Sequence, residues 1–234
     1  MFLTMVLNHS SNFSHQEPSE KYSHERHKVL VSVEIVLFTI RNGVFEVLVV
    51  KRNSPPFLDF WELPGGLIRL DIGQRGESAD DAALRELNRS TGLTGASLRY
   101  LEQLGTYGDP DRDPREERTI AIAYMGIAAN APELPEQNEA SFVPVSYVED
   151  ELSNKLAFDH SIILSDAISK TRIGVQYSRL AAGFCTSSFT VSQLRHIHEI
   201  VLGKKLDPGN FQKKVLAAEG YLTEAGQSER VAAT

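Results

Sequence analysis

Cysteine is nearly absent from this 234-residue chain, and its one occurrence is Cys185. A lone cysteine excludes an intramolecular disulfide framework and fits a reducing compartment, so we expect a cytoplasmic protein. Long hydrophobic runs are also missing, since nothing approaches the roughly 18 consecutive apolar residues that a membrane span needs. The opening MFLTMVL is apolar but lacks a basic leader and a small-residue cleavage site, so we do not expect a signal peptide.

The apolar content of 41% is typical of a globular protein, but the charge is unevenly distributed. The whole chain has a formal net charge of −7. Residues 160–234 hold 9 Lys and Arg against 6 Asp and Glu, whereas residues 1–159 hold 15 against 25. An acidic body followed by a mildly basic segment indicates that the two parts have different functions. A chance distribution of the charges is the alternative.

The segment before residue 28 has few of the apolar residues that a packed core requires beyond its first seven. Residues 8–27 are polar and rich in Ser and His, so we expect residues 1–27 to form a disordered tail. The four histidines of this segment are His9, His15, His24 and His27. Their irregular spacing favours a solvated tail over a metal site.

Residues 28–158 have the pattern of a mixed sheet around one helix. The segments expected to form strands are 29–40, 44–52, 60–66, 96–107, 118–128 and 141–148. RNG between the first two is a hairpin turn signal, and PGG predicts a tight glycine turn. Ser78 can cap a helix that runs to about Ser90 and stops at Gly92. The buried row of that helix is expected to contain Ala79, Ala83 and Leu87. The predicted fold is an α/β sandwich.

Residues 159–234 have a helical pattern instead. We expect Asp159 to cap a first helix, whose apolar residues include Ile163, Ala167 and Ile168. The signals for a second helix are a Thr190–Gln193 capping box, a Phe189–Leu194 hydrophobic staple and a stop at Gly203. Those for a third are Asp207 as N-cap, Pro208 at the first position and a stop at Gly220. A short hairpin is expected in 221–234. Two capped helices, a short turn and a hairpin predict a winged helix-turn-helix.

Several separated features between residues 62 and 93 agree in order with one motif. They are ELPGG, GES with Glu77, the Arg85-Glu86-Leu87 triplet and the closing Gly92-Leu93. Together they resemble the box of the Nudix family, which implies the α/β/α sandwich of that family. Ten residues separate Gly66 from Glu77, where the family's box has five. In that family two further carboxylates follow the triplet, at the positions that Arg89 and Ser90 hold here.

Positions 86, 89 and 90 lie one helical turn apart and share a face. Three carboxylates there would converge on a hard divalent cation, which would polarise a pyrophosphate and activate water. Here Arg89 places a positive charge where a cation would bind, and like charges repel by roughly 4 kcal/mol at 4 Å. We therefore expect poor Mg²⁺ binding and no efficient hydrolysis. Two alternatives stay open: a hydrolase that uses Glu77, Asp80 and Asp81, or a scaffold without a ligand.

Residues 104–119 carry three arginines beside Tyr107. The guanidinium fork matches pyrophosphate oxygens, and tyrosine can stack on a base or ribose. A solvated loop of mixed charge is the alternative that composition alone favours. TYGDPDRDPR resembles the motif after the box in ADP-ribose-type Nudix proteins, and residues 156–164 resemble the end of the Nudix domain in their regulatory relatives. The expected ligand-binding residues are Arg52, Gly65, Gly66, Glu86, Arg89, Tyr107, Arg112, Arg115 and Arg118.

The third C-terminal helix has the pattern of a DNA-reading helix. Asn210, Lys213 and Lys214 lie at i, i+3 and i+4, and an apolar row of Phe211, Val215 and Ala218 lies opposite. Asn can read adenine in the major groove, whereas Lys contacts guanine or phosphate. A solvated helix face is the alternative. The expected DNA-binding residues are Thr190, Gln193, Arg195, Lys204, Lys205, Asn210, Gln212, Lys213 and Lys214.

Residues 29–226 as a whole resemble the Nudix-related transcriptional regulators of NAD metabolism, the NrtR family, and the resemblance is strongest over 189–216. It implies a homodimeric bacterial repressor with a palindromic DNA operator ahead of NAD biosynthesis or salvage genes, and no membrane partner. It also implies a degenerate Nudix domain that senses ADP-ribose as effector and requires no cofactor. The family often carries arginines at positions 212 and 213, which leaves the operator sequence open. The alternatives are an active ADP-ribose pyrophosphatase with a dimerising tail and a Nudix-fold regulator of sugar catabolism.

Overall fold

The computed structural model describes residues 28–71, 75–115, 117–134 and 139–218. The tail expected in residues 1–27 and the hairpin expected in 221–234 lie outside the described residues, so both stay predictions. Within the described part, no helix is long and apolar enough to cross a membrane.

Within the described residues, seven strands form one sheet. They are β1 (Val29–Arg41), β2 (Val44–Lys51), β3 (Trp61–Glu62), β4 (Gly65–Leu67), β5 (Tyr100–Tyr107), β6 (Arg118–Ile127) and β7 (Ala140–Pro144). The order is β3-β2-β1-β6-β5, with β4 also paired to β1 and β7 to β2. The β1–β6 pair is parallel and the other pairs are antiparallel. The expected mixed sheet is confirmed.

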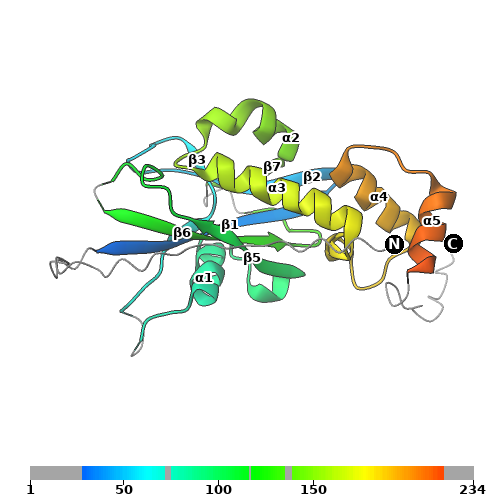
Figure 1. Cartoon of the computed structure of the whole chain (residues 1–234), viewed down its shortest axis with the longest axis horizontal. Helices are drawn as coiled ribbons and strands as arrows, with labels where there is room; N and C mark the ends of the chain where they lie inside the picture. Colours follow the sequence, from blue (N-terminus) through cyan, green and yellow to red (C-terminus); the bar gives the residue numbers. More distant parts are fainter. Residues whose placement is uncertain (1–27, 72–74, 116, 135–138, 219–234) are drawn as a thin grey trace, which may run out of the picture.

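Helices cover both faces of this sheet (Figure 1). Helix α1 (Ala79–Thr91) lies on one side, and α3 (His160–Tyr177) lies on the other with the short α2 (Val145–Tyr147). Helices α4 (Val191–Leu202) and α5 (Pro208–Ala217) lie beyond one end of the sheet. The remaining turns are η1 (Gly95–Ser97), η3 (Val148–Leu152), η4 (Ser153–Lys155) and η5 (Leu180–Phe184).

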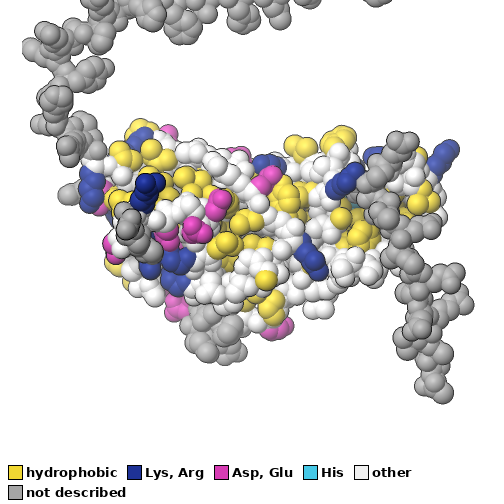
Figure 2. Space-filling model, turned by 90° about the horizontal axis from the view of Figure 1, so that it is seen from below, with side chains coloured by type: hydrophobic (Ala, Val, Ile, Leu, Met, Phe, Trp, Pro, Cys, Tyr) yellow, Lys and Arg dark blue, Asp and Glu magenta, His cyan; other side chains and the backbone are white. Residues whose placement is uncertain are grey.

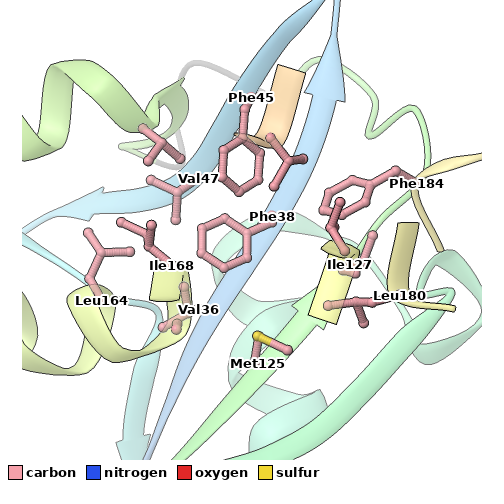
Figure 3. Close-up of a cluster of buried hydrophobic side chains, with 14 of the residues drawn as sticks. Val36, Phe38, Phe45, Val47, Met125, Ile127, Leu164, Ile168, Leu180 and Phe184 are labelled. Carbon is pink, nitrogen blue, oxygen red and sulfur yellow. The ribbon is translucent and has the colours of Figure 1, made fainter. Parts of the chain in front are cut away.

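Alternate residues of β1 point to the two faces of the sheet, because successive side chains of a strand do so. Ile35 and Leu37 pack on the α1 side. Val36 and Phe38 pack on the other side, where Leu164 and Ile168 of α3 meet them (Figure 3). Glu34 belongs to this second row, and its side chain is therefore directed to the layer that contains α3.

Most of the local helix signals hold where they were expected. The Ser78 hydroxyl accepts the Asp81 N–H, and Gly92 ends α1 in the left-handed conformation with φ 75°. Thr190 and Gln193 form the capping box of α4. Asp207 accepts the Asn210 N–H at the start of α5, with Pro208 in the first turn.

Three boundaries differ from the expectation. The strand expected in 141–148 ends at Pro144, since proline lacks the N–H that continues a ladder, and Val145 begins a helical turn. Strand β5 begins at Tyr100 rather than at residue 96, which lies in η1. Helix α5 ends at Ala217 instead of running to Gly220, and Ala218 is exposed rather than part of the apolar row.

The prediction that Asp159 caps α3 is wrong as regards its side chain. Asp159 occupies the N-cap position, but its carboxylate makes no capping hydrogen bond. Both of its oxygens instead accept from Arg112, at 2.9 and 2.7 Å. An ion pair with a distant residue therefore outcompetes the local cap.

Replacement of Ile163 tests the packing of α3 on the sheet. Ile163 is fully buried, whereas its neighbour Ile162 is 57% exposed. We expect Ile163→Ala to lower the free energy of unfolding by about 2–5 kcal/mol, because it leaves a cavity in the core. The matched control Ile162→Ala should change it by about 0.5 kcal/mol or less. Urea denaturation measures both, and equal losses would contradict this packing.

Candidate functional site

A small polar pocket lies beside the start of α3, with a volume of about 140 Å³. Five of the expected ligand-binding residues line it: Arg52, Gly65, Gly66, Arg112 and Arg115. They come from the end of β2, from β4 and from the loop between β5 and β6. We call it the arginine pocket. The fold therefore brings together side chains that are up to 63 positions apart in the sequence.

Pairing of β4 with β1 sets one wall of this pocket. Gly65 pairs with Glu34 and Gly66 with Val33. A Cβ on Gly65 would lie 1.9 Å from a carboxylate oxygen of Glu34, and one on Gly66 would lie 2.6 Å from an oxygen of Glu86. Glycine is thus required at both positions because these carboxylates approach the backbone closely. The two glycines lie in a strand rather than in the tight turn that the sequence suggested.

Each of the three arginines is paired with a carboxylate. Arg52 donates to Glu62, Arg112 to Asp159 and Arg115 to Asp113. The Arg112–Asp159 pair is almost fully buried, with side chains 3% and 10% exposed. The pocket thus holds three cations whose charge is largely balanced in this structure.

Phe158 forms an aromatic wall between two of these cations. The guanidinium of Arg52 lies 4.8 Å from its ring centroid and that of Arg115 lies 5.4 Å away. The ring also packs edge-on against Phe57, with centroids 5.1 Å apart. Stacking of this kind holds the guanidinium groups in place.

Two buried titratable groups, Glu34 and His160, complete the pocket. Burial raises the pKa of Glu34 to about 8, so its carboxyl is neutral at pH 7. Burial also lowers the pKa of His160 to about 3. The Nδ1 atom of His160 accepts the Leu63 N–H at 3.0 Å, and its Nε2 lies 3.6 Å from Glu34. A neutral Glu34 does not repel an anion from the arginines.

The remaining carboxylates of the box are held by arginines. Arg85 and Arg89 each donate to one oxygen of Glu86. Arg85 also bonds both oxygens of Glu77, which lowers the pKa of Glu77 to about 2. Glu77 additionally accepts the N–H of Arg69, and its own N–H donates to the Arg69 carbonyl. In the described ranges, no group of three His, Cys, Asp or Glu side chains is placed to hold a metal ion.

The two other acidic residues near the box are engaged elsewhere. Asp80 accepts from the hydroxyl of Tyr124 at 2.5 Å, and Asp81 from that of Ser78 at 2.7 Å. Ser90, at one position where the family carries a carboxylate, is 5% exposed. The side chain of Arg89, at the other position, is 60% exposed but bends back to Glu86.

Four expected ligand residues do not line the arginine pocket: Glu86 and Arg89 of the box, and Tyr107 and Arg118. Tyr107 lines a neighbouring hollow of about 460 Å³, which we call the outer hollow and which shares Arg112 and Phe158 with the pocket. Its hydroxyl donates to Asp166 of α3 at 2.8 Å. Arg118 donates to the Gly108 carbonyl and joins the two ends of the loop. Their predicted contacts with a ligand stay predictions.

Helix α5 presents the expected polar face. Asn210, Gln212, Lys213 and Lys214 are exposed, while Phe211 and Val215 are buried. Lys204 and Lys205 are exposed in the turn before it. On the face shown in Figure 2, dark blue Lys and Arg side chains predominate over magenta Asp and Glu at the end that carries α4 and α5.

The expected DNA-contacting residues at the start of α4 and within it make hydrogen bonds inside the protein, and their contacts with DNA stay predictions. Thr190 and Gln193 are exposed but bond each other's backbone in the capping box. Arg195 donates to Glu199 at 2.7 Å and to the Leu206 carbonyl. Glu199 also accepts the Leu206 N–H at 2.8 Å. These two side chains therefore fix the turn between α4 and α5.

Sequence reasoning missed the carboxylates and rings that surround the arginines. The missed polar and aromatic pocket residues are Ser32, Glu34, Glu62, Asp113, Thr119, Phe158 and His160. One signal was present: a glutamate inside the apolar run of β1 is unusual, because buried charges require a partner. The others become visible only in three dimensions.

Two family models cover most of this chain. Residues 29–165 match the NUDIX domain, and residues 183–233 match the NrtR DNA-binding winged helix domain. The ADPR responsive transcriptional repressor NtrR of Acinetobacter baylyi is 28% identical over 202 residues, which are 86% of this chain and 77% of that protein. An ADP-ribose pyrophosphatase of Methanocaldococcus jannaschii is 32% identical over 131 residues, 53% of this chain and 69% of that enzyme.

Solved structures of Shewanella oneidensis NrtR have the same fold. The one complexed with a 27mer DNA is 27% identical, with a TM-score of 0.67, and the match covers 85% of this chain and 90% of that one. Its NUDIX domain complexed with ADP ribose is 28% identical, with a TM-score of 0.51 and coverage of 64% and 93%.

The buried Glu34 predicts a pH-dependent stability. Its pKa is raised from 4.5 to about 8, so the native state keeps a proton that the unfolded chain releases between these pH values. Stability contributed by this group is therefore present below pH 4.5 and is lost as the pH rises toward 8. Relative to the parent, Glu34→Gln should gain on the order of 2–4 kcal/mol between pH 5 and pH 8.

Urea denaturation at both pH values measures this gain. Glu151→Gln, at an exposed position, controls for the change from Glu to Gln. If the difference in free energy of unfolding between the parent and Glu34→Gln does not depend on pH, Glu34 is not buried in its protonated form.

Proposed function

The chain belongs to the Nudix family, and we propose that it is a transcriptional repressor that binds DNA and responds to ADP-ribose. The observation that carries this proposal is the combination of two sites in one chain. The exposed amide and ammonium row of α5 suits a DNA groove, and the arginine pocket suits a diphosphate. A pyrophosphatase needs only the second of these.

The chemistry of the pocket supports a diphosphate ligand. Three guanidinium groups converge on it, while Glu34 is neutral and burial also raises the pKa of Glu62. Its volume suits a diphosphate rather than a whole nucleotide sugar, so we place the rest of ADP-ribose in the outer hollow, where Tyr107 lies. We propose that Glu86 and Arg89 form the bottom of the ligand site, on the side of Gly66 away from the arginine pocket.

We infer that this Nudix domain is degenerate and hydrolyses its ligand poorly. A divalent cation does not fit the face of Glu86, because Arg85 and Arg89 occupy both carboxylate oxygens and bring positive charge. Arg89 and Ser90 hold positions where a hydrolase needs carboxylates. A receptor that keeps its ligand can report on it, whereas an enzyme would consume it.

The arrangement of the whole repressor follows from the same proposal. We place the ligand-sensing domain at residues 28–177, because α3 shares its buried residues with the sheet, and the DNA-binding domain after it. This moves the boundary from the predicted residue 159. We further propose a cytoplasmic homodimer on a palindromic operator ahead of NAD biosynthesis or salvage genes, since two-fold symmetric DNA matches a two-fold symmetric protein.

The first experiment is fluorescence anisotropy of a labelled duplex from the region upstream of neighbouring NAD genes. We expect the protein to bind it about 1000-fold or more tightly than random DNA at physiological salt. ADP-ribose should change this affinity, whereas ADP or ribose should not. Binding no tighter than to random DNA would overturn the repressor and favour the pyrophosphatase with a dimerising tail.

A pair of lysine variants tests the reading helix in the same assay. Lys213→Ala should weaken operator binding and reduce the salt slope by about 1, because one cationic contact is lost. Lys155→Ala, exposed in η4 on the other domain, is the matched control and should leave both unchanged.

The double substitution Arg89→Glu, Ser90→Glu tests the degenerate box. It restores carboxylates on the face of Glu86, so Mg²⁺-dependent hydrolysis of ADP-ribose should rise above that of the parent. Asn88→Glu adds an acid at an exposed position of the same helix and is the control. A double variant as inert as the parent, or a parent that already hydrolyses ADP-ribose efficiently, would contradict the inference.

A further inference from the structure

Helix α3 connects the arginine pocket with the DNA-binding part. Phe158 and His160, at its N-terminal end, line the pocket. Near its other end, Val175 is buried in an apolar cluster that continues into Leu194 of α4 and Phe211 of α5. Because packed interiors transmit displacements rather than absorb them, a shift at the start of α3 reaches both helices.

Of the three pocket arginines, Arg112 is the one held by the start of this helix. The partners of Arg52 and Arg115 lie in β3 and in the loop after β5. Arg112 instead donates through Nε and Nη2 to both oxygens of Asp159. One buried ion pair therefore joins an anion-binding group of the pocket to the first residue before α3.

Asp159 has a second place for its carboxylate. It is the N-cap residue of α3, where a carboxylate accepts N–H groups of the first turn and is stabilised by the positive end of the helix. Its carboxylate does not occupy that capping position because both of its oxygens accept hydrogen bonds from Arg112. The two positions exclude each other, which makes this residue a two-state element.

We propose that the diphosphate of the ligand competes with Asp159 for Arg112, and that the released Asp159 caps α3. This rests on the proposed function and adds the residue through which the pocket acts on DNA binding. A diphosphate matches the guanidinium fork as a carboxylate does and carries more charge. Asp159 also lines the outer hollow, and the role proposed for it is that of a positioning residue that acts through Arg112 and α3.

Asp159→Asn tests the competition. Asparagine caps helices as well as aspartate but cannot form the charged pair, so the variant should resemble the ligand-bound state without ligand. Its operator affinity without ADP-ribose should move to the value that the parent reaches at saturating ADP-ribose. By linkage, its affinity for ADP-ribose should rise by about fivefold or more. Calorimetry and anisotropy measure the two.

Asp159→Glu shifts the balance in the opposite direction and guards against simple unfolding. Glutamate keeps the charge for Arg112 but is not among the favoured N-caps, so operator affinity without ligand should match the parent and ADP-ribose should bind more weakly. Glu149→Gln is the matched control, because Glu149 forms a two-bond pair with Arg172 of α3 far along the helix from the pocket. Neither affinity should change in it.

Two results would overturn the proposal. One is an Asp159→Asn variant with the parent's operator affinity. The other is a loss of ADP-ribose affinity in that variant, which would mean that Asp159 only orients Arg112. Failure of the proposed function is distinct, because there the parent itself binds no operator or does not respond to ADP-ribose.

Discussion

The double burial of β1 is the constraint on which the rest of the structure depends. This strand pairs with β2, β4 and β6, and both its faces are covered by helices. Its alternation therefore assigns one row of side chains to α1 and the other to α3. Glu34 lies in the second row, and this row together with the register of β4 places it beside His160 and Gly65. The pocket is thus a consequence of how the sheet is assembled.

Charge compensation is the second recurring feature. Arginines that the sequence presents as free cations are paired in the folded chain, both in the arginine pocket and on α1. An incoming anion there exchanges one set of charge-assisted bonds for another. The affinity for the anion is then set by the difference between two similar interaction energies, that of the arginines with the anion and that of the arginines with their carboxylates. Such a site is suited to reversible occupancy, as a sensor requires.

The elements that the sequence predicted well are those with local signals. Ser78, Thr190 and Asp207 cap their helices because the N–H groups that they accept lie three residues away. Asp159 has the same local signal but is claimed by Arg112, 47 positions distant, and no local pattern contains that information. The loop arginines were proposed from their side-chain chemistry together with the resemblance of TYGDPDRDPR to a family motif. Their partners were not, since carboxylates and rings far apart in the chain become neighbours only through the sheet register.

The contacts between Glu77 and Arg69 have a consequence for the length of the box. Backbone and side-chain hydrogen bonds join these two residues, and Arg85 fastens Glu77 to the helix. The loop between them therefore has its two ends held together, whatever its length. Doubling the length of such a loop costs only about 0.6 kcal/mol of closure entropy. The five residues by which this chain exceeds the usual spacing therefore need not displace the helix that follows Glu77.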